Sequence, residues 1–215
     1  MICKDMNPNQ WYTQLSIMKL LFVPGFKENM QSRDYNSTLE VFSELGYDPV
    51  FVNINWRRTS QGDWVNQLEE ARCRVGFDIP LAGFSFGAVT ALLSTSKCQP
   101  SQLWLFSLSP LFAEYENTWT KTDKKMCGKK RLDVASKMSL ADITPVVACP
   151  TVLMVGDKET VKWPEMLRVF ETAKQTLPNV HSSIIENTGH DVTSPAYIDE
   201  IHRTNLAFLS QSQKL

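Results

Sequence analysis

Short apolar runs alternate with amphipathic stretches along most of this 215-residue chain, and the alternation restricts the folds open to it. Several runs are continuously hydrophobic, which is typical of strands buried on both faces of a parallel sheet. The amphipathic stretches between them have the pattern of helices that cover such a sheet. We therefore predict an α/β fold with a mostly parallel central sheet and helices on both faces.

The predicted elements follow one another from residue 18 to residue 210. We expect strands at Met18–Val23, Pro49–Asn55, Ile79–Gly83, Leu103–Leu108, Thr151–Val155 and Val180–Glu186. We expect helices at Tyr35–Leu45, Asp63–Val75, Phe86–Ser96, Pro164–Thr176 and Ala196–Ser210. Gly46 suits the end of the first helix, and Pro164 suits a first helical turn.

Length and composition predict a single domain. A chain of this size with 43% hydrophobic residues can bury one core but is short for two. We expect that domain at residues 18–215, preceded by a disordered extension at residues 1–17. Residues 110–150 have weak periodicity and many polar side chains, so we expect a lid-like excursion there.

Charge and cysteine usage exclude several classes of protein. A formal net charge of −1 argues against general nucleic-acid binding. The five cysteines are odd in number and form no C-x-x-C pair, which favours free thiols in a reducing compartment over disulfides or a zinc site. The first apolar run is too short to span a bilayer and contains Lys19, so we expect a cytoplasmic protein without a transmembrane segment.

The segment Gly83-Phe84-Ser85-Phe86-Gly87 lies between a predicted strand and a predicted helix. A G-x-S-x-G sequence in that setting is typical of a sharp turn that exposes the serine hydroxyl as a nucleophile. Glycines suit both ends of the turn because backbone segments approach each other there. The alternative is a glycine-rich turn that binds phosphate, but the chain has neither a P-loop lysine nor a G-x-G-x-x-G sequence.

A serine nucleophile needs a base, and the base needs an acid that holds its tautomer. His190 follows the last predicted strand in a loop, where it is the best candidate base, although a simple turn residue is the alternative. The loop after the preceding strand contains two carboxylates, Asp157 and Glu159. Both can reach a loop histidine, both also suit a helix N-terminus, and residue chemistry alone does not separate them.

Backbone N–H groups usually stabilise the oxyanion that forms when a serine attacks a carbonyl carbon. Phe86, directly after the candidate nucleophile, can supply one such group. The loop after the first strand, Val23-Pro24-Gly25-Phe26, can supply the second, and we expect it from Phe26. A plain tight turn at Pro24-Gly25 is compatible with that role.

Taken together, these segments resemble the α/β-hydrolase family from about Met18 to Leu209, including the chain order of nucleophile, acid and histidine. The resemblance implies a minimal version of that fold with a short lid or cap, and no metal or organic cofactor. In many members the acid lies three residues after the glycine of its loop, which favours Glu159 and leaves Asp157 as the alternative. The chain departs from the family at Pro24-Gly25, where a His-Gly that often braces the loop is frequent.

Aromatic residues near these segments suggest an apolar acyl pocket, with core packing as the alternative for about half of them. We expect substrate-binding roles for Phe84, Phe112 and Tyr115. The segment from Lys121 to Arg131 carries six basic residues and one acidic residue. It suits an anionic carrier or surface, although a solvated lid is the simpler interpretation.

These observations favour a serine hydrolase that cleaves a carboxylic ester or thioester through an acyl-enzyme on Ser85. Small carboxylesterases and acyl-carrier or CoA thioesterases are the members that the chain resembles most in size. Two alternatives stay open at this stage. One is a non-catalytic ligand-binding or scaffold protein with the same fold, and the other is a small serine peptidase.

Overall fold

A computed structural model describes the backbone of residues 18–212 and the side chains of residues 18–205. The extension expected at residues 1–17 lies outside the described residues. Six parallel strands form one sheet in the order β2-β1-β3-β4-β5-β6. They are β1 (Met18–Val23), β2 (Tyr47–Phe51), β3 (Leu81–Phe84), β4 (Leu103–Phe106), β5 (Thr151–Gly156) and β6 (Val180–Ile185).

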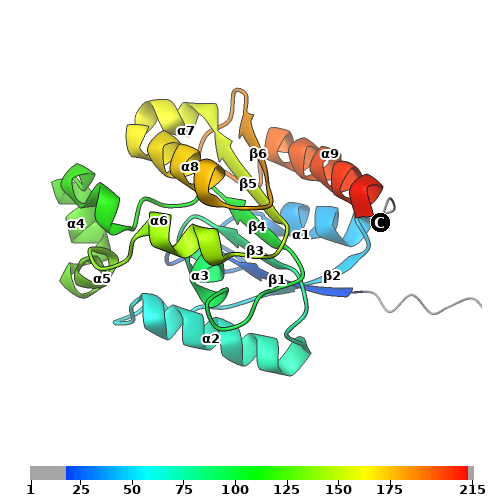
Figure 1. Ribbon diagram of the computed structural model, residues 1–215, viewed down its shortest axis with the longest axis horizontal. Coiled ribbons are helices and arrows are strands. Elements are labelled where there is room, and N and C mark those ends of the chain that lie inside the picture. Colours follow the sequence, from blue (N-terminus) through cyan, green and yellow to red (C-terminus); the bar gives the residue numbers. More distant parts are fainter. Residues whose placement is uncertain (1–17, 213–215) are drawn as a thin grey trace, which may run out of the picture.

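Helices cover both faces of this sheet, which confirms the predicted fold class (Figure 1). Helices α1 (Tyr35–Glu44) and α9 (Pro195–Ser212) pack together against one face. Helices α2 (Gln61–Val75), α3 (Phe86–Ser94) and α8 (Pro164–Thr176) pack against the other face.

Strands β3 and β4 are apolar throughout because both of their faces are buried. In β4, Trp104 and Phe106 belong to the core on the side of α1 and α9, whereas Leu103 and Leu105 belong to the core on the side of α2 and α3. All four side chains are fully buried. Alternate residues of a strand point to opposite faces, so a strand covered on both sides has few positions for a polar residue.

Several short elements were not predicted from the sequence. Between β4 and β5 the chain forms η1 (Ala113–Thr118), α4 (Lys121–Cys127), α5 (Lys129–Ala135), α6 (Leu140–Ile143) and η2 (Thr144–Val146). Helix α7 (Asp157–Lys162) follows β5. Helices α4 and α5 lie at one end of the molecule, at the left of Figure 1. They are too short to show a helical period, so local capping defines them better than periodicity does.

Caps mark where these short helices begin and end. At the start of α4 the Thr120 hydroxyl accepts a hydrogen bond from the Asp123 N–H, and the Asp123 carboxylate accepts one from the Thr120 N–H. Gly128 has a φ of 76° and separates α4 from α5. Such a φ favours glycine, so the chain changes direction between the two helices.

The element boundaries differ from prediction mainly at β2 and β3. Strand β2 begins at Tyr47 and ends at Phe51, whereas the sequence predicted Pro49–Asn55. Residues 52–58 instead form a loop at the carboxyl end of β2. Apolar residues of this loop, including Val52, Ile54 and Trp56, are buried in the core although they are not in the sheet, which explains why the segment resembled a strand.

Candidate active site

The strand order places several loops together at the carboxyl edge of the sheet. The chain passes from β1 to β2 on one side and then returns to β3 on the other side of β1. At such a reversal the loops after the two central strands diverge and leave a crevice. The loop after β1 contains Phe26, and the turn after β3 contains Ser85. Both predicted segments therefore lie at the same crevice.

Ser85 lies in a tight turn between β3 and α3. Its φ of 57° and ψ of −117° are unusual for a residue with a side chain. A Cβ atom at Gly83 would collide with the backbone of Gly87, and a Cβ at Gly87 would collide with the carbonyl oxygens of Val23 and Pro24. The two glycines therefore allow the close approach that the turn requires.

His190 connects Ser85 to Glu159. The Ser85 Oγ lies 3.0 Å from His190 Nε2, and His190 Nδ1 lies 2.5 Å from Glu159 Oε2. A carboxylate can only accept, so Nδ1 carries the proton, and Nε2 is then the acceptor for the serine hydroxyl. The other two histidines lie elsewhere; His202 pairs with Glu44 at 3.1 Å, and His181 is exposed on β6.

Glu159 is buried, with 1% of its surface exposed, and its carboxylate has three hydrogen-bond donors. Besides His190, the Gly156 N–H donates to Oε1 at 2.6 Å and the Ser107 hydroxyl donates to the same oxygen at 2.7 Å. A buried carboxylate needs such donors to offset its desolvation. Because the Gly156 and Ser107 donors both bind Oε1, the other oxygen, Oε2, faces His190.

Asp157 occupies a different position from Glu159. Its Oδ1 accepts the Thr188 N–H at 2.9 Å, so it contacts the backbone of the loop that carries His190 rather than the imidazole. The backbone N–H of Asn187, followed by those of Thr188 and Lys158, lowers the pKa of Asp157 below its ordinary value. Of the two carboxylates left open by the sequence, the structure brings Glu159 to the histidine.

The two predicted oxyanion donors lie on segments in direct contact. The rings of Phe26 and Phe86 have centroids 4.7 Å apart, and Gly87 packs against the loop after β1. Within the described residues, neither the Phe26 N–H nor the Phe86 N–H has a hydrogen-bond acceptor. The N–H of Gly25 is engaged, because it donates to Glu28 Oε2 and to the Tyr35 hydroxyl.

A cavity of about 400 Å³ opens beside Ser85 and His190. Its apolar wall includes Phe84 and, from other elements, Trp119, Met126, Leu132, Trp163 and Met166. Three of these residues, Trp119, Met126 and Leu132, come from the segment expected to form a lid. The cavity therefore lies between the crevice of the sheet and the short helices after β4.

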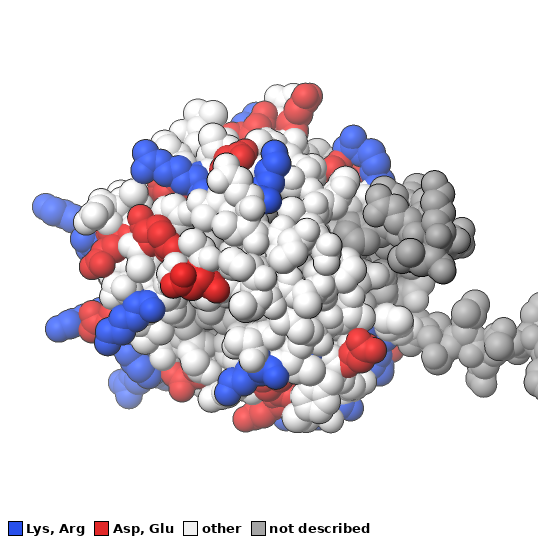
Figure 2. All heavy atoms as spheres, in the orientation of Figure 1, with Lys and Arg blue, Asp and Glu red and all other residues white. Residues whose placement is uncertain are grey.

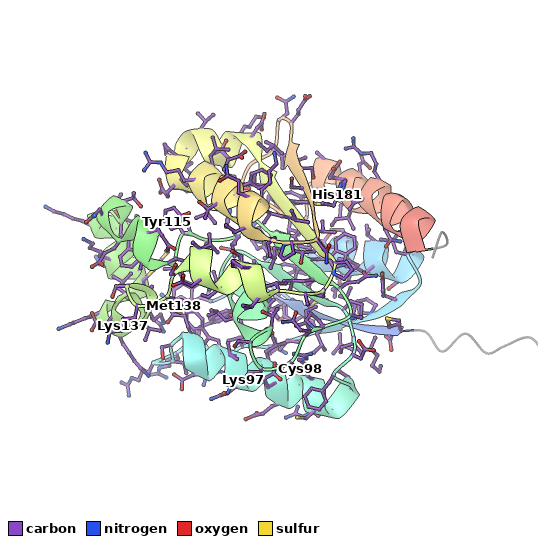
Figure 3. The ribbon with its side chains drawn as sticks, in the orientation of Figure 1. Lys97, Cys98, Tyr115, Lys137, Met138 and His181 are labelled. Atoms are coloured by element: carbon purple, nitrogen blue, oxygen red, sulfur yellow. The ribbon has the colours of Figure 1, made fainter. Side chains whose placement is uncertain are left out.

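The structure does not bring Phe112 and Tyr115 to this cavity. Phe112 is fully buried in the core. The Tyr115 hydroxyl lies 3.1 Å from Thr172 Oγ1 of α8 and contributes to the packing of η1 on that helix (Figure 3). Their position after β4 suggested a role in substrate binding, but Phe112 packs in the core and Tyr115 packs against α8.

Sequence reasoning missed three hydroxyl groups around the site. The Ser107 hydroxyl has one proton, which it donates to Glu159. The Tyr197 hydroxyl, 2.7 Å from Ser107 Oγ, is therefore the donor in the contact between the two hydroxyls. Burial raises the pKa of Tyr197 well above its ordinary value and keeps it a donor. Ser109 Oγ lies 3.1 Å from Ser85 Oγ. The sequence signal for these groups was limited to Ser107 and Ser109, which closely follow the buried strand β4.

Sequence reasoning also missed a charged cluster that joins the two loops flanking Ser85. Arg33 donates from Nε to Glu28 Oε1 at 2.6 Å and from a terminal nitrogen to the His190 carbonyl oxygen at 3.2 Å. The same nitrogen lies 3.2 Å from Asp191 Oδ1. Glu28 also accepts a hydrogen bond from the Tyr35 hydroxyl. The cluster thus joins the loop after β1 to the loop that carries His190.

Part of the predicted basic segment is used inside the protein. Lys130 pairs with Asp63 at 3.3 Å. Arg131 donates to the Cys127 carbonyl oxygen at 2.7 Å and also to that of Trp56. Among the residues with described side chains, no group of three or more His, Cys, Asp or Glu is arranged to hold a metal ion. No helix in the described range has the length and hydropathy of a membrane span.

The fold is similar to solved α/β hydrolases over nearly the whole chain. An alpha/beta hydrolase enzyme from the metagenome of sediments of the lagoon of Mar Chica, Morocco, is 21% identical, with a TM-score of 0.66 over 92% of this chain and 91% of that chain. Est1E from Butyrivibrio proteoclasticus is 14% identical, with a TM-score of 0.72 over 92% and 89%. Alpha/beta hydrolase domain-containing protein 10 from mouse is 17% identical, with a TM-score of 0.69 over 90% of each chain.

No protein-family model matches the sequence, and no curated protein matches it. The structural similarity therefore carries the comparison, and it agrees with the all-parallel sheet covered by helices. Together they confirm the resemblance seen in the sequence at the level of the fold. The chain has the α/β-hydrolase fold.

Proposed function

We propose that this protein is a serine hydrolase that cleaves a carboxylic ester or thioester through an acyl-enzyme on Ser85. The observation that carries the proposal is the continuous series of hydrogen bonds from Ser85 through His190 to Glu159. Three residues far apart in the sequence form this series at the crevice of the sheet. It is the arrangement that acyl transfer by a serine requires.

In the proposed reaction the Ser85 oxygen attacks the substrate carbonyl carbon while its proton passes to His190 Nε2. The Phe26 and Phe86 N–H groups stabilise the negative oxygen. When the tetrahedral intermediate collapses, the bond to the leaving group breaks, and His190 returns the proton to the departing alcohol or thiol. Water then attacks the acyl-enzyme by the same route, which releases the carboxylic acid and restores Ser85.

Glu159 orients His190 and stabilises the positive charge that forms on the imidazole during each step. Ser107 and Gly156 hold the Glu159 carboxylate in place. Ser109 donates to the Ser85 oxygen, because the proton of Ser85 is directed at His190. This contact keeps the nucleophile oriented before attack.

The cavity beside Ser85 suits the acyl part of the substrate, since its wall is largely aromatic and aliphatic. We propose that residues 110–150 act as a lid of the single domain at 18–215, because Trp119, Met126 and Leu132 close one side of this cavity. Several solved structures with this fold are named esterases, including a naproxen esterase from Bacillus subtilis. The naproxen esterase is 13% identical to this chain. These names support an ester as the substrate class.

A fluorophosphonate probe tests the proposal, because it reacts with activated serine hydroxyls. We expect labelling of the wild-type protein at Ser85, loss of labelling in Ser85→Ala, and strongly reduced labelling in His190→Ala. Ser96→Ala is a matched control, since Ser96 is an exposed serine beyond α3. Folded wild-type protein that is not labelled would contradict the proposal and favour a non-catalytic binding protein.

A further inference from the structure

A second cavity lies beside the loop after β1 that contains Phe26. It has a volume of about 550 Å³ and is formed by the loops that follow β1 and β2 together with the start of α5. Lys27, Arg57, Arg58 and Arg131 contribute to its lining. The loops at the carboxyl ends of adjacent parallel strands are where ligands of such sheets bind. We refer to this cavity as the basic groove.

The basic groove has an excess of positive charge. Its one carboxylate, Glu28, is engaged by Arg33, Tyr35 and the Gly25 N–H. Lys27, Arg57 and Arg58 have no ion-pair partner among the residues with described side chains. The whole chain has a formal net charge of −1, so this concentration of cations is local.

Two of the four cations of the groove, Lys27 and Arg131, lie close to Phe26. The Arg131 guanidinium and the Lys27 ammonium each lie 4.9 Å from the centroid of the Phe26 ring. Arg131 is fixed by hydrogen bonds to two backbone carbonyl oxygens, those of Cys127 and Trp56. A guanidinium held in this way loses little conformational entropy when it binds an anion. Because Lys27 and Arg131 contact the Phe26 ring, the groove adjoins the residue whose N–H is one of the two proposed oxyanion donors.

We refer to the cavity beside Ser85 as the acyl cavity. Glu28 lines both the acyl cavity and the basic groove, but the two differ in charge. The charged residues lining the acyl cavity are Glu28, Asp123, Glu165 and Arg33, apart from His190. This set has a net negative charge, so an anionic acyl group is disfavoured there. A substrate anion is instead attracted to the basic groove, on the other side of Phe26 and Glu28.

We propose that the basic groove binds a phosphate group on the leaving-group half of the substrate, so that the acyl half occupies the apolar cavity. This inference rests on the proposed function and specifies its substrate as the ester or thioester of a phosphorylated alcohol or thiol. Phosphate suits several separate cations because it offers up to three oxygens that accept charge-assisted hydrogen bonds. Arg57 and Arg58, which are exposed, are the residues free to turn toward it.

The lysines of α4 and α5 are the competing site for an anion. Figure 2 shows Lys and Arg side chains projecting at that end of the molecule, with acidic side chains among them. Lys121 and Lys125 are exposed and line neither cavity. The basic groove is favoured because two of its cations, Lys27 and Arg131, adjoin Phe26, whereas Lys121 and Lys125 are exposed outside both cavities.

Two matched pairs of substrates test the inference. One pair is 1-hexanoylglycerol and 1-hexanoylglycerol 3-phosphate, and the other is hexanoyl-pantetheine and hexanoyl-4′-phosphopantetheine. The members of each pair differ by one phosphate at a short or a long distance from the carbonyl group. The measured quantity is the ratio of kcat/KM for the phosphorylated member to that for the neutral member, at low salt.

We expect the wild-type ratio to exceed one for at least one pair and to fall about tenfold in Arg57→Gln/Arg58→Gln, through the loss of two partly exposed charged contacts. The control Lys97→Gln/Lys137→Gln removes the same charge from exposed positions, labelled in Figure 3, that do not line the groove. We expect its ratio to match wild type. Added salt should reduce the wild-type ratio, because partly exposed charges are screened.

Wild-type ratios at or below one for both pairs would overturn the inference, as would a larger decrease in Lys121→Gln/Lys125→Gln than in the arginine variant. If none of the four substrates is hydrolysed, the ratio is undefined and the proposed function fails separately. The groove is then tested by titrating inorganic phosphate into Ser85→Ala protein by calorimetry. Binding that is lost in Ser85→Ala/Arg57→Gln/Arg58→Gln supports the groove, and an absence of binding contradicts it.

Discussion

Replacing Glu159 with glutamine tests the assignment of the acid, because the two side chains have nearly the same shape. The Glu159 oxygen Oε1 accepts from the Gly156 N–H and from Ser107, so the glutamine oxygen is expected at that position. The glutamine NH₂ group then faces His190 Nδ1, which was 2.5 Å from Oε2. An NH₂ group donates, so His190 is forced to accept at Nδ1 and to carry its proton on Nε2.

A proton on Nε2 prevents His190 from accepting the proton of Ser85. A wrong tautomer of this kind lowers kcat by about 10³- to 10⁴-fold in serine hydrolases, or about 4 to 5.5 kcal/mol of transition-state stabilisation. The variant should stay folded because the volume and two of the hydrogen bonds are preserved. Steady-state hydrolysis of p-nitrophenyl butyrate measures the loss, with circular dichroism as the check on folding.

Asp157→Asn is the matched control for this experiment. Asparagine retains an oxygen that can accept the Thr188 N–H, so the loop carrying His190 should stay in place. We expect kcat to change by less than about threefold, since no reacting group is altered. A loss in Asp157→Asn that equals or exceeds the loss in Glu159→Gln would refute the assignment of the acid.

Three further predictions concern the support of the site. Ser107→Ala should lower kcat about tenfold with little change in KM, because Glu159 loses one donor and the buried Tyr197 hydroxyl loses its acceptor. Ser101→Ala is the control, since Ser101 is a half-buried serine before β4. Gly87→Ala should destabilise the protein by about 3 kcal/mol in urea denaturation, since its Cβ would collide with backbone carbonyls, and an unchanged midpoint would contradict the turn geometry. Burial raises the pKa of Cys127 from 9.0 to about 11, so its neutral form stabilises the folded state. That contribution should be complete below pH 9 and lost as the pH rises to 11, and it should be absent from Cys127→Ala; parallel pH profiles of the two proteins would contradict it.

The sequence predicted the sheet well because burial on both faces leaves a strong pattern. Strand β1 was predicted with its observed bounds, and β4 and β5 each differ only at the carboxyl end. At the end of β4 the chain leaves the sheet while its residues stay buried, as Ser107 and Leu108 do. Hydrophobicity reports burial rather than hydrogen bonding between strands, so it does not mark the last residue of a strand.

The short helices after β4 and β5 left no comparable pattern. Helix α6 has four residues and depends on the Ser139 hydroxyl, which accepts from the Asp142 N–H. A single cap of this kind is too local to be distinguished from an ordinary turn. The same limit explains the expectation for Phe112 and Tyr115, since η1 and the Phe112 that precedes it are too short a segment to leave a pattern that shows where these side chains point.

The candidate site was partly predictable because its main groups are attached to recognisable loops. The order of Ser85, Glu159 and His190 along the chain, and their positions after strands, indicated that they would meet at one edge of the sheet. The choice between Glu159 and Asp157 depends on how α7 begins, because Glu159 turns back to the Gly156 N–H. Ser107 and Tyr197 were missed because their contact joins residues 90 positions apart.

Mass spectrometry of the protein during turnover tests the central claim most directly. Rapid acid quench of wild-type protein with p-nitrophenyl butyrate should trap a butyryl group on the peptide that contains Ser85, together with a burst of p-nitrophenolate. Ser85→Ala should show neither the adduct nor the burst. Turnover retained by Ser85→Ala would contradict the proposed function. So would steady turnover by wild type in which another residue carries the acyl group and the Ser85 peptide stays unmodified.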